Sequence, residues 1–164
     1  MTGSILDAQI VAAQAAVRDG GTDGGVHRLV ELAAVASDSR AAGVGAMFDN
    51  YFGGINSRDF ARAVSVFDPA GVLDPNNSDQ VGRFSHDVST TTDGDIVIRS
   101  IDTNPSRAAA LIVVVTFTST QAAGYGPAGS TNETCTHWRV QYTLTQTAAG
   151  EYRILRGTAT HQAC

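Results

Sequence analysis

The chain has no lysine, and all 11 of its cationic side chains are arginines. Against them stand 16 acidic groups, which give a formal charge of -5, and the arginines are spread along the sequence without forming a basic cluster. Nucleic-acid binding depends on clustered positive charge that neutralises phosphates. We therefore expect no nucleic-acid partner. The missing lysines, with abundant Ala, Val, Thr and Asp, are typical of a GC-rich actinobacterial genome.

Long apolar runs are also missing. The longest candidate, residues 111–115, is far shorter than the ~20 residues that a membrane-spanning helix requires, so we expect no membrane span. Residues 1–17 have neither a basic start nor an unbroken apolar middle, and so they do not resemble a signal peptide.

Motifs for cofactors and metals are missing as well. The sequence has no nucleophile elbow and no paired-cysteine metal motif, and the glycines within residues 20–25 lack the spacing and the preceding strand of a phosphate-binding loop. We expect neither a cofactor nor a bound metal.

The sequence does contain a clear helical pattern followed by a strand pattern. Apolar side chains recur at i, i+3, i+4 and i+7 over residues 44–55, which predicts a helix with one face in the core. We expect a second helix after it, with Ser57 as N-cap and its end at Asp68-Pro69, and a short third helix over 81–88. Weaker patterns over 5–17 and 26–36 indicate additional N-terminal helices. We interpret residues 1–40 as a helical extension and 41–164 as the main domain.

From residue 95 the apolar period changes to two. The segments 96–101, 110–118, 136–145 and 151–160 are rich in Val, Ile, Thr, Tyr and Phe and are separated by turn residues. Four consecutive strands predict an antiparallel meander with one buried face, so the fold class is α+β.

The last two strands are joined by a turn at residues 148–150 that fits a three-residue hairpin loop with Gly150 in the left-handed conformation. That turn pairs Thr147 with Glu151 and places Leu144 opposite Ile154 and Tyr142 opposite Arg156.

The same register places Cys135 opposite Ala163, one position from Cys164. A single bulge would then bring the two sulfur atoms within bonding range, and we predict a disulfide between Cys135 and Cys164. The alternative is a pair of free thiols in a cytosolic protein. With the disulfide, the protein works outside the cytoplasm, secreted or in the cell envelope; with free cysteines, it is cytoplasmic.

Two sets of residues carry a resemblance to a known superfamily. The first is Phe-Asp-Asn-Tyr-Phe at 48–52, which continues into Ile-Asn-Ser-Arg-Asp-Phe at 55–60, and the second is Cys-Thr-His-Trp at 135–138 with Tyr142, Leu144 and Gly-Glu-Tyr at 150–152. Together they resemble the nuclear-transport-factor-two-like superfamily, which includes the SnoaL-like cyclases, and in particular its small exported actinobacterial domains. The resemblance covers residues 44–160.

The resemblance implies a cone: a curved antiparallel sheet wrapped around the long helix, with an apolar pocket open at one end. Members of the superfamily include isomerases, epoxide hydrolases, dehydratases, polyketide cyclases and non-catalytic binding or dimerising domains, so the fold alone does not identify the chemistry. Its enzymes place an Asp or His acid-base residue deep in the cone with a Tyr, Asn or Arg partner.

The candidate catalytic residues are His86 or Asp102 as base, with Tyr51 as helper. Asp95 and Arg99 precede Asp102 on the same strand and suggest the Asp-Arg-Asp arrangement of the superfamily's epoxide hydrolases. Strict alternation, however, places Asp102 on the other face from Asp95 and Arg99, and the alternative is a solvated strand edge.

The remaining candidates concern binding. His137 and His161 face each other in the register above, but two ligands make a poor metal site, and surface histidines are the alternative. The aromatic side chains expected to contact a ligand are Phe48, Tyr51, Trp138 and Tyr142. For Tyr51 and Trp138 core packing is the alternative.

Two functions follow as hypotheses. The favoured one is a non-enzymatic cone-fold domain of an exported or envelope protein that binds a small apolar molecule or a protein partner, or forms a homodimer through its sheet. The alternative is a cofactor-independent, SnoaL-like cyclase, isomerase or hydrolase. The second requires an ionisable group inside the cone whose pKa is shifted.

Overall fold

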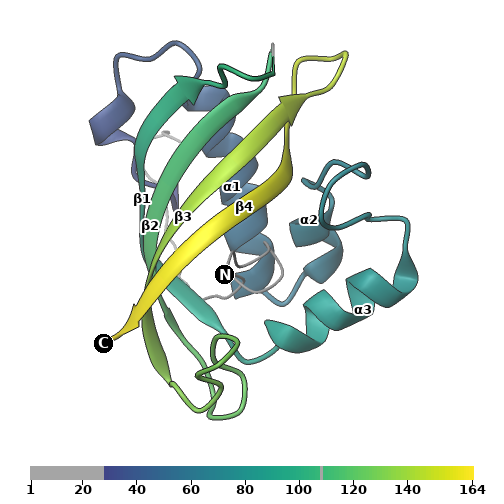
Figure 1. Ribbon diagram of the computed structural model, residues 1–164, viewed down its shortest axis with the longest axis vertical. Helices are drawn as coiled ribbons and strands as arrows, with labels where there is room; N and C mark the ends of the chain where they lie inside the picture. The colour runs from purple at the N-terminus through teal and green to yellow at the C-terminus, as the bar shows by residue number, and fades with distance from the viewer. Residues whose placement is uncertain (1–27, 108) are drawn as a thin grey trace, which may run out of the picture.

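In the part of the chain that the structure describes, a short 3-10 helix and three α-helices precede a four-stranded sheet (Figure 1). The computed structural model describes residues 28–107 and 109–164, so the helix expected over 5–17 lies outside the described residues. The elements are η1 (Ala33–Val35), α1 (Ala41–Asn56), α2 (Phe60–Val64), α3 (Ser78–Asp87), β1 (Thr92–Thr103), β2 (Leu111–Thr120), β3 (Cys135–Gln146) and β4 (Tyr152–Ala163). Within this part of the chain, no helix has the length and apolarity needed to cross a membrane.

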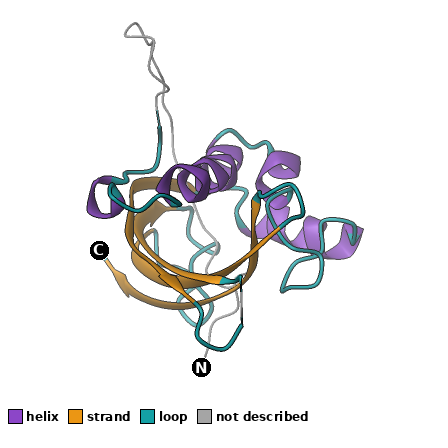
Figure 2. Cartoon of the chain, turned by 90° about the horizontal axis from the view of Figure 1, so that it is seen from above, coloured by secondary structure: helices purple, strands orange, loops and turns teal. Residues whose placement is uncertain are grey.

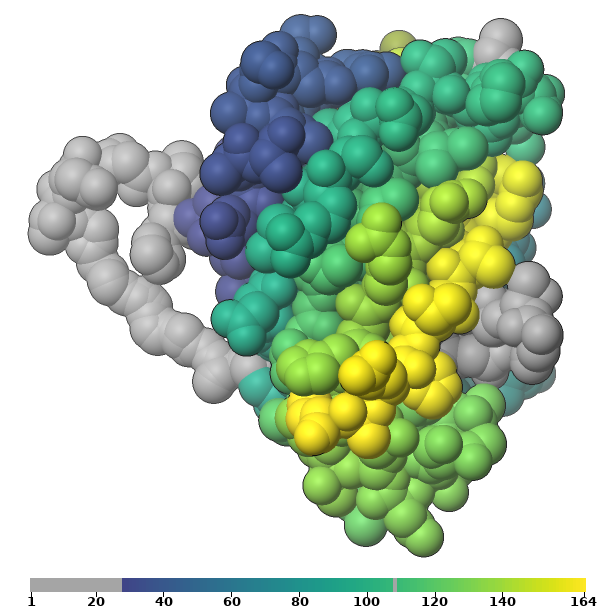
Figure 3. Space-filling view, turned by 60° about the vertical axis from the view of Figure 1, so that its left-hand side comes forward, coloured from purple at the N-terminus to yellow at the C-terminus, as the bar shows by residue number. Residues whose placement is uncertain are grey.

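The sheet is antiparallel with strand order β1-β2-β3-β4, which confirms the predicted meander. It curves through a wide arc, and α1 lies across its concave side (Figure 2). The helices leave the convex side uncovered, and there the strands run side by side across the surface (Figure 3). The structure is the α+β cone that the sequence indicated.

The core lies between α1 and the concave face of the sheet. The predicted stripe of α1 is fully buried there, and its rings meet those of the strands: Phe48 lies 4.9 Å from Tyr142 and Phe52 lies 5.0 Å from Phe117 between ring centroids. Aromatic pairs at these distances add to the gain from burying apolar area. The helix expected over 44–55 is thereby confirmed, with one further turn at its start.

The boundaries of the other helices differ from the prediction because different side chains cap them. Ser57 was expected to begin the second helix, which is wrong: its hydroxyl donates to the Gly53 carbonyl at 2.8 Å and closes α1. The N-cap of α2 is Asp59, whose carboxylate accepts from the backbone N–H of Arg62 at 3.1 Å. Similarly, Asn77 caps α3, which begins at Ser78 rather than at 81.

The segment expected to be helical over 26–36 contains only the short turn η1 in its described part. Glu31 instead forms a parallel bridge with Val97: its N–H donates to the Ile96 carbonyl at 2.8 Å, and its carbonyl accepts from Ile98 at 3.1 Å. Val30 and Val35 belong to the core, so the described end of the N-terminal extension packs on the edge of β1.

The β3–β4 hairpin has the predicted turn. Gly150 has φ +90°, and the N–H of Thr147 donates to the Glu151 carbonyl at 2.8 Å. Leu144 lies opposite Ile154 as expected, but a bulge follows at once, so Tyr142 lies opposite Gly157 and not opposite Arg156.

This bulge brings the two cysteines together. Thr136 lies opposite Ala163, and the N–H of Cys164 donates to the Cys135 carbonyl at 3.1 Å. The disulfide between Cys135 and Cys164 is present, which confirms the predicted pairing and ties the last residue to the start of β3.

The outer edge of β4 is covered by residues 66–72. The N–H of Ile154 donates to the Val66 carbonyl at 2.8 Å, and the N–H of Val72 donates to the Leu155 carbonyl at 2.9 Å. Between these bonds Gly71 lies so close to the strand that a Cβ atom would come within 2.0 Å of the Leu155 carbonyl oxygen. Only glycine fits there, because no side chain can be accommodated against a backbone atom at that distance.

Replacing this glycine tests the edge contact. Gly71→Ala is expected to lower the free energy of unfolding by about 1–3 kcal/mol, because residues 66–72 must move away from β4. Gly82→Ala, in an exposed position of α3 with nothing within 4 Å of the added carbon, is expected to be neutral or to raise it by up to about 1 kcal/mol. Urea denaturation of the two variants provides the measurement, and equal stabilities would contradict the described contact.

A thiol titration tests the disulfide. The denatured protein is expected to show no free thiol before reduction and two after it, since the chain has two cysteines and the described structure leaves neither free. The double variant Cys135→Ser with Cys164→Ser is expected to lose about 2–4 kcal/mol of unfolding free energy, because the bridge restricts the unfolded chain. Thiols that react without reductant, in protein prepared under oxidising conditions, would contradict the pairing.

Candidate functional site

Several buried polar atoms on the concave side of the sheet have no hydrogen-bond partner. Within the described residues these are both carboxyl oxygens of Asp93, the hydroxyl of Tyr142, Oγ1 of Thr91 and Oε1 of Gln121. Buried polar groups are nearly always paired, so unpaired ones in a native structure need an explanation. Asp93 and Tyr142 lie on the inner face of the sheet, Thr91 and Gln121 lie just beyond the ends of β1 and β2, and together these four residues mark the candidate site.

Asp93 is the central group of the site. It lies near the start of β1, opposite Ser119, and is 1% exposed. Burial raises the pKa of its carboxyl group well above the usual range, and the nearby charge of Arg58 opposes this only in part. A desolvated carboxyl group without hydrogen bonds disfavours the ionised form, so burial favours the protonated form of Asp93.

The backbone of Asp93 is held from α1 by a reciprocal pair of hydrogen bonds. The side-chain amide of Asn56, the last residue of the helix, donates to the Asp93 carbonyl at 3.2 Å and accepts from the Asp93 N–H at 3.1 Å. Arg58, which has φ +63°, donates to the carbonyls of Ile55 and Thr91 from the same helix end. The end of α1 therefore fixes the backbone from which the carboxyl group projects.

A β-bulge two residues later decides which way Asp93 points. The ladder of β1 with β2 is interrupted between Gly94 and Val97, and Asp95 takes a left-handed conformation with φ +51°. Asp93 and Ile96 are consequently both buried, although they are three residues apart, while Asp95 is exposed. Bulges of this kind re-aim side chains.

Tyr51 and Tyr142 accompany Asp93 inside the cone. Burial is the main cause that raises the pKa of each phenol well above its usual value, and the charge that Asp93 would carry raises both further. The three groups are thus close enough to influence one another's ionisation. Burial favours the protonated form of all three, in which each can donate a hydrogen bond.

The aromatic residues expected to contact a ligand are all buried on this inner face. Phe48 packs on Tyr142, while Trp138 stacks on Phe117 at 6.2 Å between ring centroids. The Trp138 indole N–H donates to the Ser119 hydroxyl at 3.0 Å, so its polar end is satisfied by the strand next to it. These rings form the apolar part of the site.

The other two residues predicted to be catalytic lie outside this site. The side chain of His86 is 71% exposed on α3 and forms an ion pair of 3.6 Å with Asp87 when its ring is protonated. Asp102 is exposed near the end of β1. Asp95 and Arg99 are exposed as well, and Arg99 donates to the Thr116 hydroxyl at 2.8 Å.

The two histidines expected to face each other do not. The bulge in β4 shifts the register by one position, so His137 lies opposite Gln162, and His161 lies opposite Trp138 and packs against its ring at 4.9 Å. In the described part of the chain, no three His, Cys, Asp or Glu side chains are grouped as a metal site would require.

Sequence reasoning missed Asp93 because the strand was expected to begin at residue 96. The preceding Thr-Thr-Asp-Gly stretch is made of residues common in turns. The available signal was Gly94-Asp95 directly ahead of a strand, since a glycine next to a residue that tolerates the left-handed conformation is typical of a bulge.

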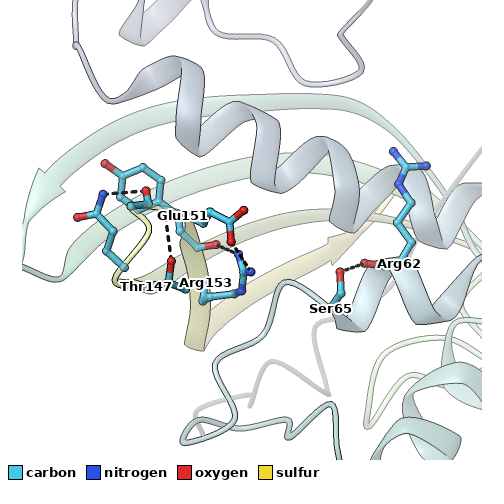
Figure 4. A network of polar contacts seen from close by, with 8 residues as sticks. Arg62, Ser65, Thr147, Glu151 and Arg153 are labelled. Atoms are coloured by element: carbon cyan, nitrogen blue, oxygen red, sulfur yellow. Dashed lines mark hydrogen bonds and ion pairs between the residues drawn. The ribbon is translucent and has the colours of Figure 1, made fainter.

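A separate hollow lies on the outside, between α1 and the β3–β4 hairpin. It has a volume of about 280 Å³ and is lined by residues that include Met47, Val66 and Tyr152. At its rim Arg153 donates to the Glu151 carboxylate at 2.9 Å (Figure 4). The same view shows the Ser65 hydroxyl, at the end of α2, which donates to the Arg62 carbonyl at 2.7 Å. The charged groups at the rim pair with each other, in contrast to the unpaired groups of the interior.

No protein-family model and no curated protein matches the sequence. Solved structures of similar fold include the following three. A ketosteroid isomerase-like protein from Erwinia carotovora atroseptica is 15% identical, with a TM-score of 0.50 over 77% of this chain and 99% of that one. ActVI-ORFA from Streptomyces coelicolor is 14% identical, with a TM-score of 0.50 over 76% of this chain and 96% of that one.

The third is a protein from Xanthomonas campestris, provisionally assigned as a calcium/calmodulin dependent protein kinase II association domain. It is 17% identical, with a TM-score of 0.54 over 84% of this chain and 98% of that one. At these identities the likenesses show the fold. The chain has the cone fold of the nuclear-transport-factor-two-like superfamily, as the motifs around α1 and β3 indicated.

The raised pKa of Asp93 predicts a pH dependence of stability. The folded protein keeps a proton on this carboxyl group that the unfolded chain releases above about pH 4. Its contribution to stability is therefore complete below pH 4, and it decreases by about 1.4 kcal/mol per pH unit above that, until the folded pKa is reached.

Urea denaturation between about pH 4 and pH 8 measures this effect as the difference in the free energy of unfolding between the wild type and Asp93→Asn. The stability of the wild type relative to Asp93→Asn is expected to decrease as the pH rises above about pH 4. Asp102→Asn removes an exposed carboxylate from the same strand and serves as the control. A difference between wild type and Asp93→Asn that does not vary with pH would contradict the neutral, buried state of Asp93.

Proposed function

We propose that this protein is a cofactor-independent acid-base catalyst that moves a proton on a small carbonyl compound, as in an isomerisation or a cyclisation. The observation that carries the proposal is the carboxyl group of Asp93, which is buried and free of hydrogen bonds at both oxygens, on a backbone that Asn56 holds in place. A purely structural carboxyl group would be paired.

A carboxyl group with two free oxygens suits proton transfer between the oxygen and the α-carbon of a ketone. The protonated oxygen of Asp93 gives its proton to the carbonyl oxygen of the substrate, and the other oxygen accepts the proton from the α-carbon. The enol forms and Asp93 is a neutral acid again. The reverse transfer to a different carbon completes an isomerisation. In a cyclisation the enol carbon attacks a second carbonyl, the enol oxygen returns its proton to Asp93, and Asp93 gives a proton to the oxygen of the second carbonyl, which becomes a hydroxyl.

The two phenols suit the charge that develops on the substrate. Tyr142 has a buried hydroxyl without a partner, and Tyr51 lies close enough to share its electrostatic environment. A neutral donor in a dry site stabilises a developing oxyanion and needs no reorganisation during the reaction. The raised pKa values keep both hydroxyl groups protonated as donors.

The fold neighbours are in keeping with this proposal, since they include a ketosteroid isomerase-like protein. The base in this proposal is Asp93, in place of His86 or Asp102, because both of those side chains are exposed. Since the site itself is buried, we expect a substrate to bind only after side chains around it have moved, which slows its association.

The second candidate function is binding without turnover, as the sequence favoured. The observation in its support is that the unpaired hydroxyl of Tyr142 and the rings of Phe48 and Trp138 are buried on the same side, where they could hold a carbonyl ligand without any chemical step. The disulfide supports export to an oxidising compartment under either function. Pairing of two copies through the convex sheet stays a prediction.

Deuterium incorporation separates the two functions. Acetophenone, which has an exchangeable methyl group next to its carbonyl, is incubated with the protein in D₂O and followed by proton NMR. The wild type is expected to accelerate the exchange, Asp93→Asn to reduce the acceleration by about 100-fold or more, and Tyr142→Phe by about 10- to 100-fold.

The matched control is Asp102→Asn, which is expected to exchange at the wild-type rate, and circular dichroism checks that each variant is folded. Binding of acetophenone without accelerated exchange would favour the binding function. If Asp93→Asn accelerates deuterium exchange as much as the wild type does, Asp93 does not take part in the proton transfer.

A further inference from the structure

The unpaired polar atoms of the site form two groups along the inner face of the sheet. Thr91 directly precedes and Gln121 directly follows the Thr92–Thr120 pair that ends the β1–β2 ladder, so both lie just beyond the strands, next to the Asp93–Ser119 pair. Thr91 is 0% and Gln121 is 7% exposed. With a strand rise of about 3.3 Å per residue, this second group lies roughly 6–7 Å from the first.

The orientation of the Gln121 amide is determined by its neighbours. Its Nε2 donates to the Glu133 backbone carbonyl at 2.7 Å and to the Thr136 hydroxyl at 3.1 Å. The Thr136 hydroxyl uses its own proton on the Glu133 carboxylate at 2.6 Å. Since a carbonyl oxygen can only accept, the amide nitrogen must face Glu133, and Oε1 is left as a buried acceptor without a donor.

The hydroxyl of Thr91 has no partner either, although its neighbour Thr90 uses its hydroxyl to accept from the Ala122 N–H at 3.1 Å. A hydroxyl both donates and accepts, whereas Oε1 of Gln121 only accepts. The group that satisfies both is itself a hydroxyl, which donates to Gln121 and accepts from Thr91. A carboxylate has no proton for Gln121, and an ammonium ion would be buried beside a neutral Asp93 without a counter-charge.

We infer that Thr91 and Gln121 form a second polar subsite, and that the ligand of the cone is a small, mainly apolar molecule with a hydroxyl group roughly 6–7 Å from the oxygen that meets Asp93. The rings of Phe117 and Trp138 continue the same inner face and contact its apolar part. This inference rests on the proposed function in placing a carbonyl at Asp93, and it adds the class of substrate, a hydroxy-ketone.

Two probes that differ by one hydroxyl test the subsite. The dissociation constants of 4-hydroxyacetophenone and acetophenone are measured by ligand-observed NMR for the wild type and its variants. The wild type is expected to bind the hydroxylated probe at least about tenfold more tightly. Thr91→Val and Gln121→Met are each expected to reduce this preference to about threefold or less, mainly by weakening the binding of the hydroxylated probe.

Thr91→Val removes a hydroxyl that makes no bond, and so it is expected to keep or raise the melting temperature. The matched control is Thr92→Val, next in the chain, whose side chain points to the other face of the strand and whose substitution is expected to keep the full preference. Equal binding of the two probes by the wild type would contradict the subsite. Buried water molecules that satisfy Thr91 and Gln121 would produce this result. A preference that Thr91→Val leaves unchanged would also contradict the subsite.

The same measurements separate this inference from the proposed function. If the preference for the hydroxylated probe depends on Thr91 but deuterium exchange is not accelerated, the subsite is supported and the proposed catalysis is contradicted. If deuterium exchange is accelerated and depends on Asp93 but the hydroxylated probe is not preferred, the proposed catalysis is supported and the subsite is contradicted.

Discussion

The packing of α1 against the concave face of the sheet is the contact on which the rest of the structure depends. Each aromatic ring buried in this contact contributes about 1.5–3 kcal/mol relative to its exposed state, and Phe48 and Phe52 also make ring contacts with β2 and β3. Because the sheet must curve to cover these rings, the end of the helix comes next to the start of β1. That proximity allows Asn56 to hold Asp93, so the packing and the position of the acid have one origin.

The architecture was predictable because its signals are periodic. The stripe of α1 and the alternation of β3 each repeat over many residues, and the turn at Gly150 has a defined geometry, so several observations agreed on one register. The predictions failed at single positions where side chains compete for the same backbone groups. Ser57 ends α1 rather than beginning α2 in this way, and the register of β3 against β4 was wrong beyond the bulge.

The candidate site was predictable only in part, because its polar member depends on an irregularity. Tyr51 and Tyr142 belong to regular elements, and their periodicity placed them in the interior. Asp93 is inside because a bulge at Asp95 interrupts the alternation, and no period in the sequence encodes that. The burial of a carboxyl group opposes folding, so hydrophobic patterns cannot reveal it. Positions that depart from the local sequence rules in this way are expected at functional sites.

The two outer strands have occupied edges where Glu31 pairs with β1 and where residues 66–72 pair with β4. An exposed sheet margin is a template on which another polypeptide can grow as an added strand, and this is how many proteins begin to form fibrils. Here the backbone groups that such growth would recruit are already engaged near the middle of β1 and near the start of β4. Conditions that detach either flanking segment would therefore expose a fibril-forming template before the aromatic core itself came apart.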